Sequence, residues 1–371
     1  MDRMEETTRR LLSLAGIEID GTKPWDVAVH DHRFYRRVLS QGSLGLGESY
    51  MDGWWDCDSL DEFFLRVVRA QLQSRVRKSL GLVSGVVLAR AVNLQSRRRA
   101  FQIGERHYDL GNDLFVSMLD RRMTYSCAYW KNAGSLDEAQ ENKSELICRK
   151  IGLQAGMTVL DIGCGWGGFA QYAARTYGVT VTGITVSKEQ VEFGQKLCAG
   201  LPVKIRLQDY RDLREKFDRI VSVGMFEHVG YKNYRTYMQV VSRCLKDDGL
   251  FLLHTIGGNR SVRSVDPWID KYIFPTGMLP SIRQLGAAIE GLFVMEDWHN
   301  FSADYDRTLM EWHHNFENHW DGLKSRYDER FYRMWEYYLL SCAGAFRARS
   351  NQLWQIVLSK RGVEGGYHPV R

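Results

Sequence analysis

The sequence is short of proline, and it has no long apolar run. Proline occurs 6 times in 371 residues, while hydrophobic residues make up 44% of the chain. This balance excludes a disordered or collagen-like chain and predicts a folded globular protein. No apolar run reaches the roughly 18 residues that predict a membrane-spanning helix, and residues 1–6 lack the apolar core of a signal peptide. We therefore expect a cytoplasmic protein.

Paired cysteines are absent as well. The seven cysteines, at positions 57, 127, 148, 164, 198, 244 and 342, are odd in number and scattered, and none belongs to a Cys-x-x-Cys pair. This spacing excludes a disulfide framework and a zinc ribbon, and it favours free thiols in a reducing compartment. We predict no metal site.

A large net charge is also lacking, since the whole chain carries +5, but the charge is unevenly distributed. Residues 72–106 contain eight Lys and Arg against a single acidic residue, Glu105, and an apolar segment, 80–89, lies between the basic clusters. Basic residues beside apolar ones suit an anionic membrane surface. A solvated linker packed on the protein body is the alternative. Nucleic acid ranks last, because aromatic residues do not interleave with the charges.

The distribution of patterns along the chain predicts three parts. Residues 1–80 read as a small α-rich domain, residues 81–103 as a basic linker, and residues 104–371 as the main domain. Within the first part we expect helices at 5–17 and 33–39, a strand at 25–29, a loop at 41–47, and a helix from a capping box at Ser59 to about residue 73.

In the main domain β and α patterns alternate, which predicts a mostly parallel, doubly wound α/β sheet. We expect strands at 158–162, 179–184, 203–207, 217–223 and 249–255, followed by further strands at 293–298 and 352–358. Helices are expected near 135–151, 169–177, 187–199 and 231–244. A helical insertion at about 304–350 is expected to cover the carboxyl end of the sheet as a lid.

The stretch 158–169 organises this domain. A β-branched strand ends in Asp161, passes through Gly163, Cys164, Gly165 and Gly167, and opens into a helix. Glycines permit a tight turn and a close approach of a ligand, and the helix start offers free N–H groups. The spacing differs from the Gly-x-Gly-x-x-Gly of dinucleotide sites. It resembles the first motif of class I methyltransferases, which bind S-adenosylmethionine, so we expect this turn to contact that molecule.

Two further strand ends offer contacts to the same ligand. After the second strand come Thr185 and Gln190; the amide could bond a ribose, or it could cap its own helix together with Ser187. After the third strand, Asp209 and Tyr210 suit an adenine, although Asp209 could simply form a turn. The residues alone leave both alternatives open.

Several long motifs together resemble cyclopropane fatty-acid synthases, in particular the bacterial enzymes that act on phospholipids. The matching stretches are 125–130 (YSCAYW), 159–168, 226–230 (FEHVG), 253–257 (LHTIG), 272–281 (YIFPTGMLPS) and 341–349 (SCAGAFRAR). The resemblance implies a class I S-adenosylmethionine-dependent methyltransferase fold, Rossmann-like, with a helical lid and a small α-rich N-terminal domain. It covers nearly the whole chain, including the first 100 residues that related mycolic-acid enzymes lack.

The resemblance also implies the site residues. A bicarbonate ion would be held by Cys127, Glu227, His254, the main chain of Ile256, and Tyr305. Cofactor contacts would come from Tyr125, Ser126, Gly163, Gly165, Thr185, Gln190, Asp209 and Tyr210. Cys342 lies in a motif that has been treated as the active cysteine of such enzymes, but it ranks below Cys127, because the chemistry needs no covalent nucleophile.

The implied reaction is cyclopropanation of unsaturated acyl chains in membrane phospholipids. The implied partners are an anionic membrane surface, reached from the cytoplasmic side, and a second copy of the chain in a homodimer; no nucleic acid is expected. Three alternatives remain: an amine N-methyltransferase, which would retain a Glu-His pair as at Glu227 and His228; a fatty-acid methylase, which would need a reductant; and a non-catalytic, membrane-associated binder of S-adenosylmethionine.

Overall fold

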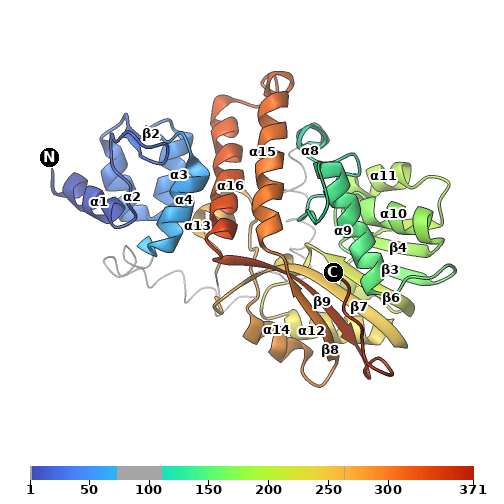
Figure 1. Ribbon diagram of the computed structural model, residues 1–371. Coiled ribbons are helices and arrows are strands. Elements are labelled where there is room, and N and C mark those ends of the chain that lie inside the picture. Colours follow the sequence, from blue (N-terminus) through green and yellow to red (C-terminus); the bar gives the residue numbers. More distant parts are fainter. Residues whose placement is uncertain (1, 73–110, 263) are drawn as a thin grey trace. The chain divides into compact units, whose positions relative to one another are not determined.

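The computed structural model describes residues 2–72, 111–262 and 264–371, and its chain falls into two compact units (Figure 1). The described residues of the first, here called the helical unit, are 2–72, 264–275 and 305–351. Those of the second, the sheet unit, are 111–262, 276–304 and 352–371. The predicted linker at 81–103 and most of the basic stretch lie outside the described residues.

The described part of the sheet unit contains a seven-stranded sheet in the order β5-β4-β3-β6-β7-β9-β8. Its strands are β3 (Thr158–Ile162), β4 (Thr180–Thr185), β5 (Val203–Leu207), β6 (Phe217–Val223), β7 (Leu245–Gly258), β8 (Val294–Asn300) and β9 (Asn351–Ser359). Neighbours from β5 to β7 pair in parallel, whereas β8 and β9 pair antiparallel. The predicted mostly parallel α/β sheet is confirmed.

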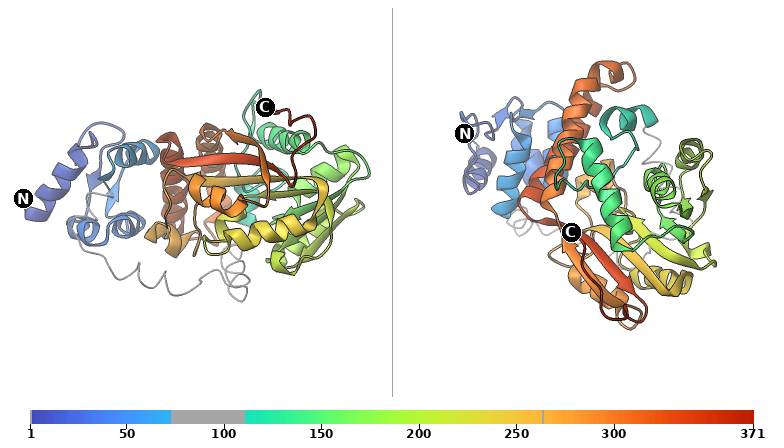
Figure 2. Two further views of the ribbon diagram at one scale, coloured as in Figure 1. Left: turned by 90° about the horizontal axis from the view of Figure 1, so that it is seen from below. Right: turned by 45° about the vertical axis from the view of Figure 1, so that its right-hand side comes forward.

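Helices cover both faces of this sheet (Figures 1 and 2). They are α9 (Leu136–Lys150), α10 (Gly168–Tyr177), α11 (Lys188–Leu197), α12 (Tyr234–Cys244) and α14 (Ile282–Ile289). The unit also contains α8 (Asn112–Met118) and the short turns η1 (Tyr210–Asp212) and η2 (Phe226–His228). Successive strand residues point to opposite faces. Val159 therefore joins the core that includes α9 and α10, while its neighbour Leu160 joins the core that includes α12 and α14.

The helical unit is assembled from segments far apart in the sequence. It contains α1 (Arg3–Ser13), α2 (Arg33–Gln41), α3 (Ser43–Met51), α4 (Leu60–Arg69), α13 (Pro267–Tyr272), α15 (Ala303–Leu323, from residue 305 on) and α16 (Glu329–Arg347), with the small strands β1 (Ala28–Val29) and β2 (Trp55–Asp56). The predicted insertion at about 304–350 thus supplies α15 and α16, an antiparallel pair (Figure 1); its role as a lid stays a prediction. Among the described helices, none has the length and apolar character to cross a bilayer.

Close packing of α16 on α4 joins the C-terminal helices to the N-terminal ones. A Cβ at Gly344 would lie 2.5 Å from the carbonyl oxygen of Asp61 and 2.7 Å from the Cβ of Phe64. One turn further on, the guanidinium of Arg347 donates to the carboxylates of Asp61 (2.6 Å) and Asp306 (2.9 Å). Glycine therefore permits the helices to approach, and the arginine ties three of them together.

The predicted loop at 41–47 is wrong, because α3 begins at Ser43. Gly42, with φ of +60°, separates α2 from α3. Gly45 and Gly47 weaken helix propensity, but their missing side chains let α3 approach α2 and the ring of Trp268. Tertiary packing thus overrides local preference.

Several predicted boundaries also move. The helix predicted for 5–17 ends at Ser13, the one predicted to reach about residue 73 ends at Arg69, and the strand predicted for 249–255 spans 245–258. The capping box predicted at Ser59 is not made, because the Ser59 side chain forms no cap hydrogen bond. Ser135 does cap α9, by accepting from the N–H of Glu138.

The contact between α16 and α4 predicts opposite effects for two glycine substitutions. Gly344→Ala should destabilise the helical unit by about 1–3 kcal/mol, because the added methyl group overpacks the helix contact. Gly322→Ala in α15 is the matched control: nothing lies within 4 Å of its Cβ position, so better helix propensity should raise stability by up to about 1 kcal/mol. Thermal unfolding of both variants checks this. Equal midpoints would contradict the packing described.

Candidate active site

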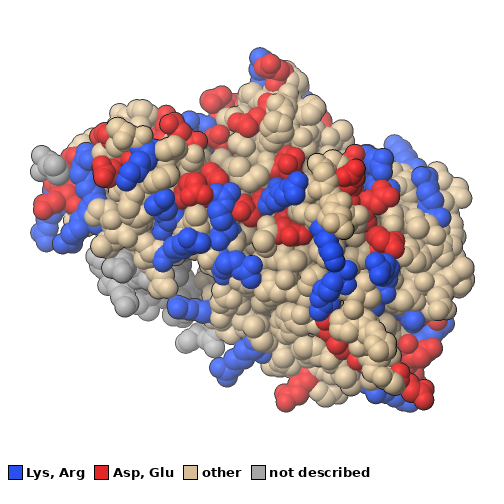
Figure 3. All heavy atoms as spheres, in the orientation of Figure 1, with Lys and Arg blue, Asp and Glu red and all other residues tan. Residues whose placement is uncertain are grey.

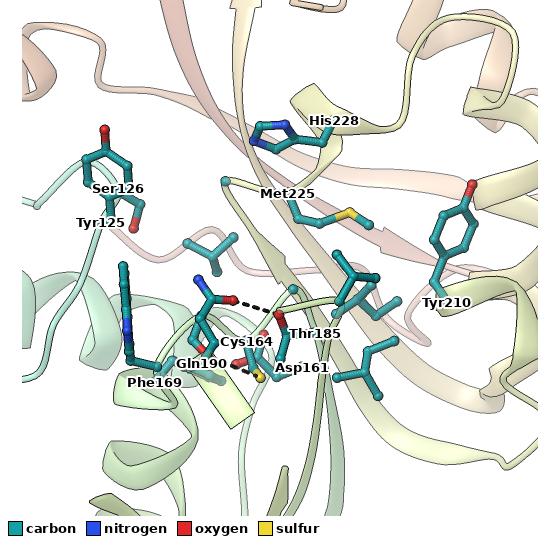
Figure 4. A pocket seen from close by; sticks show the side chains of 18 of the residues that line it. Tyr125, Ser126, Asp161, Cys164, Phe169, Thr185, Gln190, Tyr210, Met225 and His228 are labelled. Atoms are coloured by element: carbon teal, nitrogen blue, oxygen red, sulfur yellow. Dashed lines mark hydrogen bonds between the residues drawn. The ribbon is translucent and has the colours of Figure 1, made fainter. Parts of the chain in front are cut away.

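A cavity lies at the carboxyl ends of β3, β4 and β6 in the sheet unit (Figure 4). Ten of the eleven predicted cofactor residues line it: Tyr125, Ser126, Asp161, Gly163, Cys164, Gly165, Thr185, Gln190, Asp209 and Tyr210. Lys143, Met225 and His228 line it too. Parallel strands present their carboxyl ends at one edge of the sheet, which explains why residues from separate motifs meet there.

The turn after β3 needs its glycines for different reasons. Gly163 has φ of +81°, and a Cβ there would lie 2.6 Å from the side chain of Met225, so a larger residue would both strain the backbone and clash. Gly167, the remaining predicted cofactor residue, does not line the cavity. With φ of +89° it directs the chain into α10, which makes it a conformational residue in this structure.

Asp161 brings a carboxylate without a hydrogen-bond partner to the cavity. Its side chain is 1% exposed, and neither oxygen forms a hydrogen bond. Burial raises the pKa of this carboxyl to about 7, although the charge of Lys143 opposes the shift. Leaving such a group unsatisfied costs free energy. The site is therefore suited to a cationic or hydrogen-donating ligand group beside Asp161.

The hydrogen bonds of Gln190 show how far it acts as a helix cap, the alternative to a contact with the ribose. The hydroxyl of Ser187 accepts from the N–H of Gln190 and so caps α11. The Gln190 side chain does not return that bond; its Oε1 accepts from the hydroxyl of Thr185 at 2.6 Å (Figure 4). The amide is therefore held at the cavity rather than used to complete a capping box.

Asp209 forms the turn that one of its alternatives predicts, and its contact with an adenine stays a prediction. Its carboxylate accepts from the N–H of Arg211 at 2.9 Å and from the guanidinium of the same residue at 2.8 Å, which forms the turn η1. It also lines the cavity together with Tyr210. The turn thus holds Asp209 beside Tyr210 at the cavity.

A second group of buried polar atoms lies at the ends of β6 and β7, in residues that do not line the cavity. Glu227 in η2 accepts from the N–H of Ile256 through Oε1 at 2.7 Å, while its Oε2 is buried without a hydrogen-bond partner. His254 is 1% exposed, and its Nε2 also lacks one. The N–H of Ile256 donates to Glu227, and the predicted main-chain contact of Ile256 with bicarbonate stays a prediction.

Burial controls the charge of these two groups. It raises the pKa of Glu227 to about 7, an effect reduced by the hydrogen bond from Ile256. It lowers the pKa of His254 well below its usual value, so the imidazole is neutral. On its other side, Nδ1 of His254 lies 3.3 Å from the side-chain amide of Gln355, which is fully buried in β9. If the amide nitrogen donates there, Nε2 carries the imidazole proton.

The remaining predicted residues divide between the units. Cys127, in the sheet unit, is fully buried, and its thiol donates to the carbonyl of Ala128 at 3.2 Å. Tyr305, in the helical unit, packs its ring 4.5 Å from that of Phe346. Cys342 lies in α16, where burial raises the pKa of the thiol to about 12. Such a thiol is a poor nucleophile at neutral pH; the ranking of Cys342 below Cys127 stays a prediction.

Sequence reasoning missed two residues at these sites. Lys143 lies within α9, and Gln355 lies within the last strand, and neither belongs to a motif with chemical spacing. For the first, the available signal was a charge on the helix face that also carries Ala139 and Ile147. For the second, the available signal was a single polar side chain in the apolar run Leu353–Leu358.

One group of residues outside these sites has the composition of a metal site. In the helical unit, His313 lies 3.3 Å from a carboxylate oxygen of Glu317 and 3.7 Å from one of Glu336. The three could hold a metal ion. Their separations also suit direct contacts of the imidazole with the two carboxylates without a metal, and Glu336 already accepts from the hydroxyl of Tyr50.

Comparisons with known proteins agree with this geometry. A family described as "Mycolic acid cyclopropane synthetase" matches residues 95–356. A cyclopropane-fatty-acyl-phospholipid synthase of Escherichia coli (strain K12) is 57% identical over 370 residues, which cover 100% of this chain and 97% of that one. A probable fatty acid methyltransferase of Pseudomonas putida is 41% identical over 273 residues, which cover 70% and 69% of the two chains.

A solved structure extends the match to three dimensions. The mycolic acid cyclopropane synthase CmaA1, complexed with SAH and CTAB, has a TM-score of 0.66 and 34% identity, covering 70% of this chain and 98% of its own. The chain therefore belongs to the cyclopropane-fatty-acyl-phospholipid synthases, within the cyclopropane synthase family, and it has the fold of an S-adenosylmethionine-dependent methyltransferase, as its motifs predicted.

Proposed function

We propose that this chain converts cis double bonds in the acyl chains of membrane phospholipids into cyclopropane rings, taking the added carbon from S-adenosylmethionine and using bound bicarbonate as the base. The observation that carries the proposal is the pair of buried, unpartnered atoms Glu227 Oε2 and His254 Nε2, found in a chain that matches a phospholipid cyclopropane synthase over its full length.

The cavity residues fit S-adenosylmethionine. Gly163 presents its backbone to the cavity without a side chain, Asp209 and Tyr210 line the same cavity, and the unpartnered carboxylate of Asp161 suits the amino group of the methionine part. When bound, this molecule supplies an activated methyl group. An alkene is a weak nucleophile, so the chain must hold donor and double bond close together and in line.

The second group of residues fits a small hydrogen-bonding anion. Bicarbonate both donates and accepts hydrogen bonds, so its hydroxyl could donate to Glu227 Oε2 while an oxygen accepts from His254 Nε2; its chemistry there is to accept a proton. Ring closure requires one, because methyl transfer leaves a cation and the new methyl must then lose a proton. Cys127 and Tyr305 are proposed as further contacts. Burial of Glu227 and His254 also keeps out water, which would trap the cation.

The choice of phospholipid as substrate rests on the N-terminal region. The phospholipid enzyme matches this chain over all of its length, while the mycolic acid enzyme covers 70% of it. We propose that residues 1–80 engage lipid and that the chain works as a homodimer at the cytoplasmic face of the membrane. The attraction to anionic lipid is assigned to the eight Lys and Arg between residues 72 and 106, which face a single acidic residue in the sequence. On the face seen in Figure 3, acidic and basic side chains of the described residues are interspersed.

A fatty-acid methylase is the second candidate, because one relative at 41% identity bears that description. The two reactions share the methyl transfer and differ in the fate of the cation that it produces. A methylase reduces the intermediate and needs a reductant, whereas a cyclopropane synthase removes a proton. The buried groups around Glu227 favour proton removal.

Incubation with S-adenosylmethionine and vesicles of unsaturated phosphatidylglycerol tests the proposal. Mass spectrometry should show a gain of one CH₂ per converted chain together with loss of the double bond. A gain of CH₂ with the double bond retained would mean methylation without ring closure. Methyl transfer to an added amine, with no change in the lipid, would support the N-methyltransferase alternative.

Removal of bicarbonate should lower turnover about a hundredfold or more, the usual contribution of a general base. The assay uses buffers freed of carbon dioxide under inert gas, with binding of S-adenosylmethionine measured in parallel. Added bicarbonate should restore turnover, and cofactor binding should not change. Full turnover in its absence would rule out this base.

Glu227→Gln should spare cofactor binding and lose most turnover. Glutamine keeps the acceptor for the Ile256 N–H but replaces the acceptor at Oε2 with a donor. Because the pKa of Glu227 is raised to about 7, the ionised fraction falls below that pH, so wild-type turnover at saturating bicarbonate should decline from about pH 7 downward. The variant should lack this decline.

Glu364→Gln, at an exposed position near the C-terminus, is the control and should behave like the wild type. Parallel loss of cofactor binding and turnover in Glu227→Gln would mean instead that Glu227 supports the fold.

A further inference from the structure

Lys143 is a buried cation at the cofactor cavity that the proposed reaction does not use. It lies in the middle of α9, is 2% exposed and lines the cavity. Burial of an ammonium is costly, and it lowers the pKa of Lys143 to about 8. A lysine in this position needs a compensating partner, since a methionine of similar length would fill the same space without the cost.

The protein itself satisfies the ammonium of Lys143 only in part. Nζ of Lys143 donates to the hydroxyl of Ser126 at 2.8 Å, and among the described residues it forms no ion pair with a carboxylate. Asp161 is near enough for the two charges to influence each other, yet neither oxygen of Asp161 is hydrogen-bonded. The cavity thus contains a cation and an anion that are not in contact.

This arrangement complements a zwitterion. The methionine part of S-adenosylmethionine ends in an ammonium and a carboxylate on the same carbon. Asp161 suits the ammonium, so a cation is needed for the carboxylate. Ser126 and Asp161 reach the cavity from different segments, the loop before α9 and the end of β3 (Figure 4). Lys143 donates to the hydroxyl of Ser126. It can therefore act on the ligand through the Ser126 hydroxyl as well as by its own charge.

We propose that Lys143 is a positioning residue that fixes the carboxylate of S-adenosylmethionine, both by its charge and by orienting the hydroxyl of Ser126. This inference rests on the proposed use of S-adenosylmethionine. It explains why an ammonium is kept in the interior of α9, and it pairs Lys143 with Asp161 as the two poles of one binding site.

The test compares S-adenosylmethionine with its decarboxylated form, which keeps the ammonium and the sulfonium but lacks the carboxylate. Isothermal titration of both ligands into the wild type should show about 10- to 100-fold tighter binding of the intact molecule, the usual worth of a hydrogen-bonded charge. Lys143→Met should abolish most of that preference. Arg149→Met, which removes an exposed charge from the same helix, should keep it.

The ratio of the two affinities distinguishes a role of Lys143 in binding the carboxylate from a purely structural role. If Lys143→Met weakened both ligands equally, Lys143 would be only structural and the inference would fail while the proposed function stood. If the wild type bound neither ligand, the proposed function would fail and the inference with it.

If the Lys143→Met variant does not fold, a measurement on the wild type still tests the inference. The preference for intact S-adenosylmethionine should fade as the pH rises above about 8, where free Lys143 loses its proton. Asp120, Cys127 and Asp161 also act on Lys143. The α-amino group of S-adenosylmethionine itself titrates near pH 8, whereas the amine of the decarboxylated form stays charged, so the affinities are compared for the ammonium form of each ligand, in which the contribution of Asp161 is common to both. A constant preference from about pH 7 to pH 9.5 would overturn the inference.

Discussion

The site depends on polar atoms that are buried without hydrogen-bond partners. Oxygens of Asp161 and Glu227 and the Nε2 nitrogen of His254 lie in the interior of the sheet unit without hydrogen-bond partners. Each such atom costs on the order of 1–3 kcal/mol of folding free energy. The fold must supply that energy elsewhere, and a ligand that satisfies these atoms recovers it on binding. This deficit is what makes the site selective for a molecule with matching donors and acceptors.

The parallel sheet supplies both the energy and the geometry. Its strands bury apolar residues on both faces, against α9 and α10 on one side and α12 and α14 on the other. The same strands end at one edge, where β3 provides Asp161 and where η2, after β6, and β7 provide Glu227 and His254. Because a packed sheet resists movement, the unsatisfied groups cannot turn toward each other or toward solvent, and they stay available for ligands.

The parts of this site that were predictable are those fixed by short-range chemistry. The strand–glycine–helix pattern around Asp161 specifies a turn that few sequences form, and the strand ends follow from alternation of β and α patterns. Long-range packing decided the rest. The loop predicted before Tyr50 is a helix because its glycines fit against α2 and Trp268. Lys143 and Gln355 gained their roles only when α9 and β9 were brought to the site.

The two candidate reactions differ in the fate of one proton, so an isotopic label distinguishes them most directly. S-adenosylmethionine with a fully deuterated methyl group would be incubated with the protein and unsaturated phospholipid, and the acyl chains analysed by mass spectrometry. Ring closure removes one deuteron from the transferred methyl group, so the account predicts a cyclopropane ring that contains CD₂ and a chain without the double bond. A product that keeps all the deuterium of the methyl group would contradict the central claim, because no base would then have removed a proton from it.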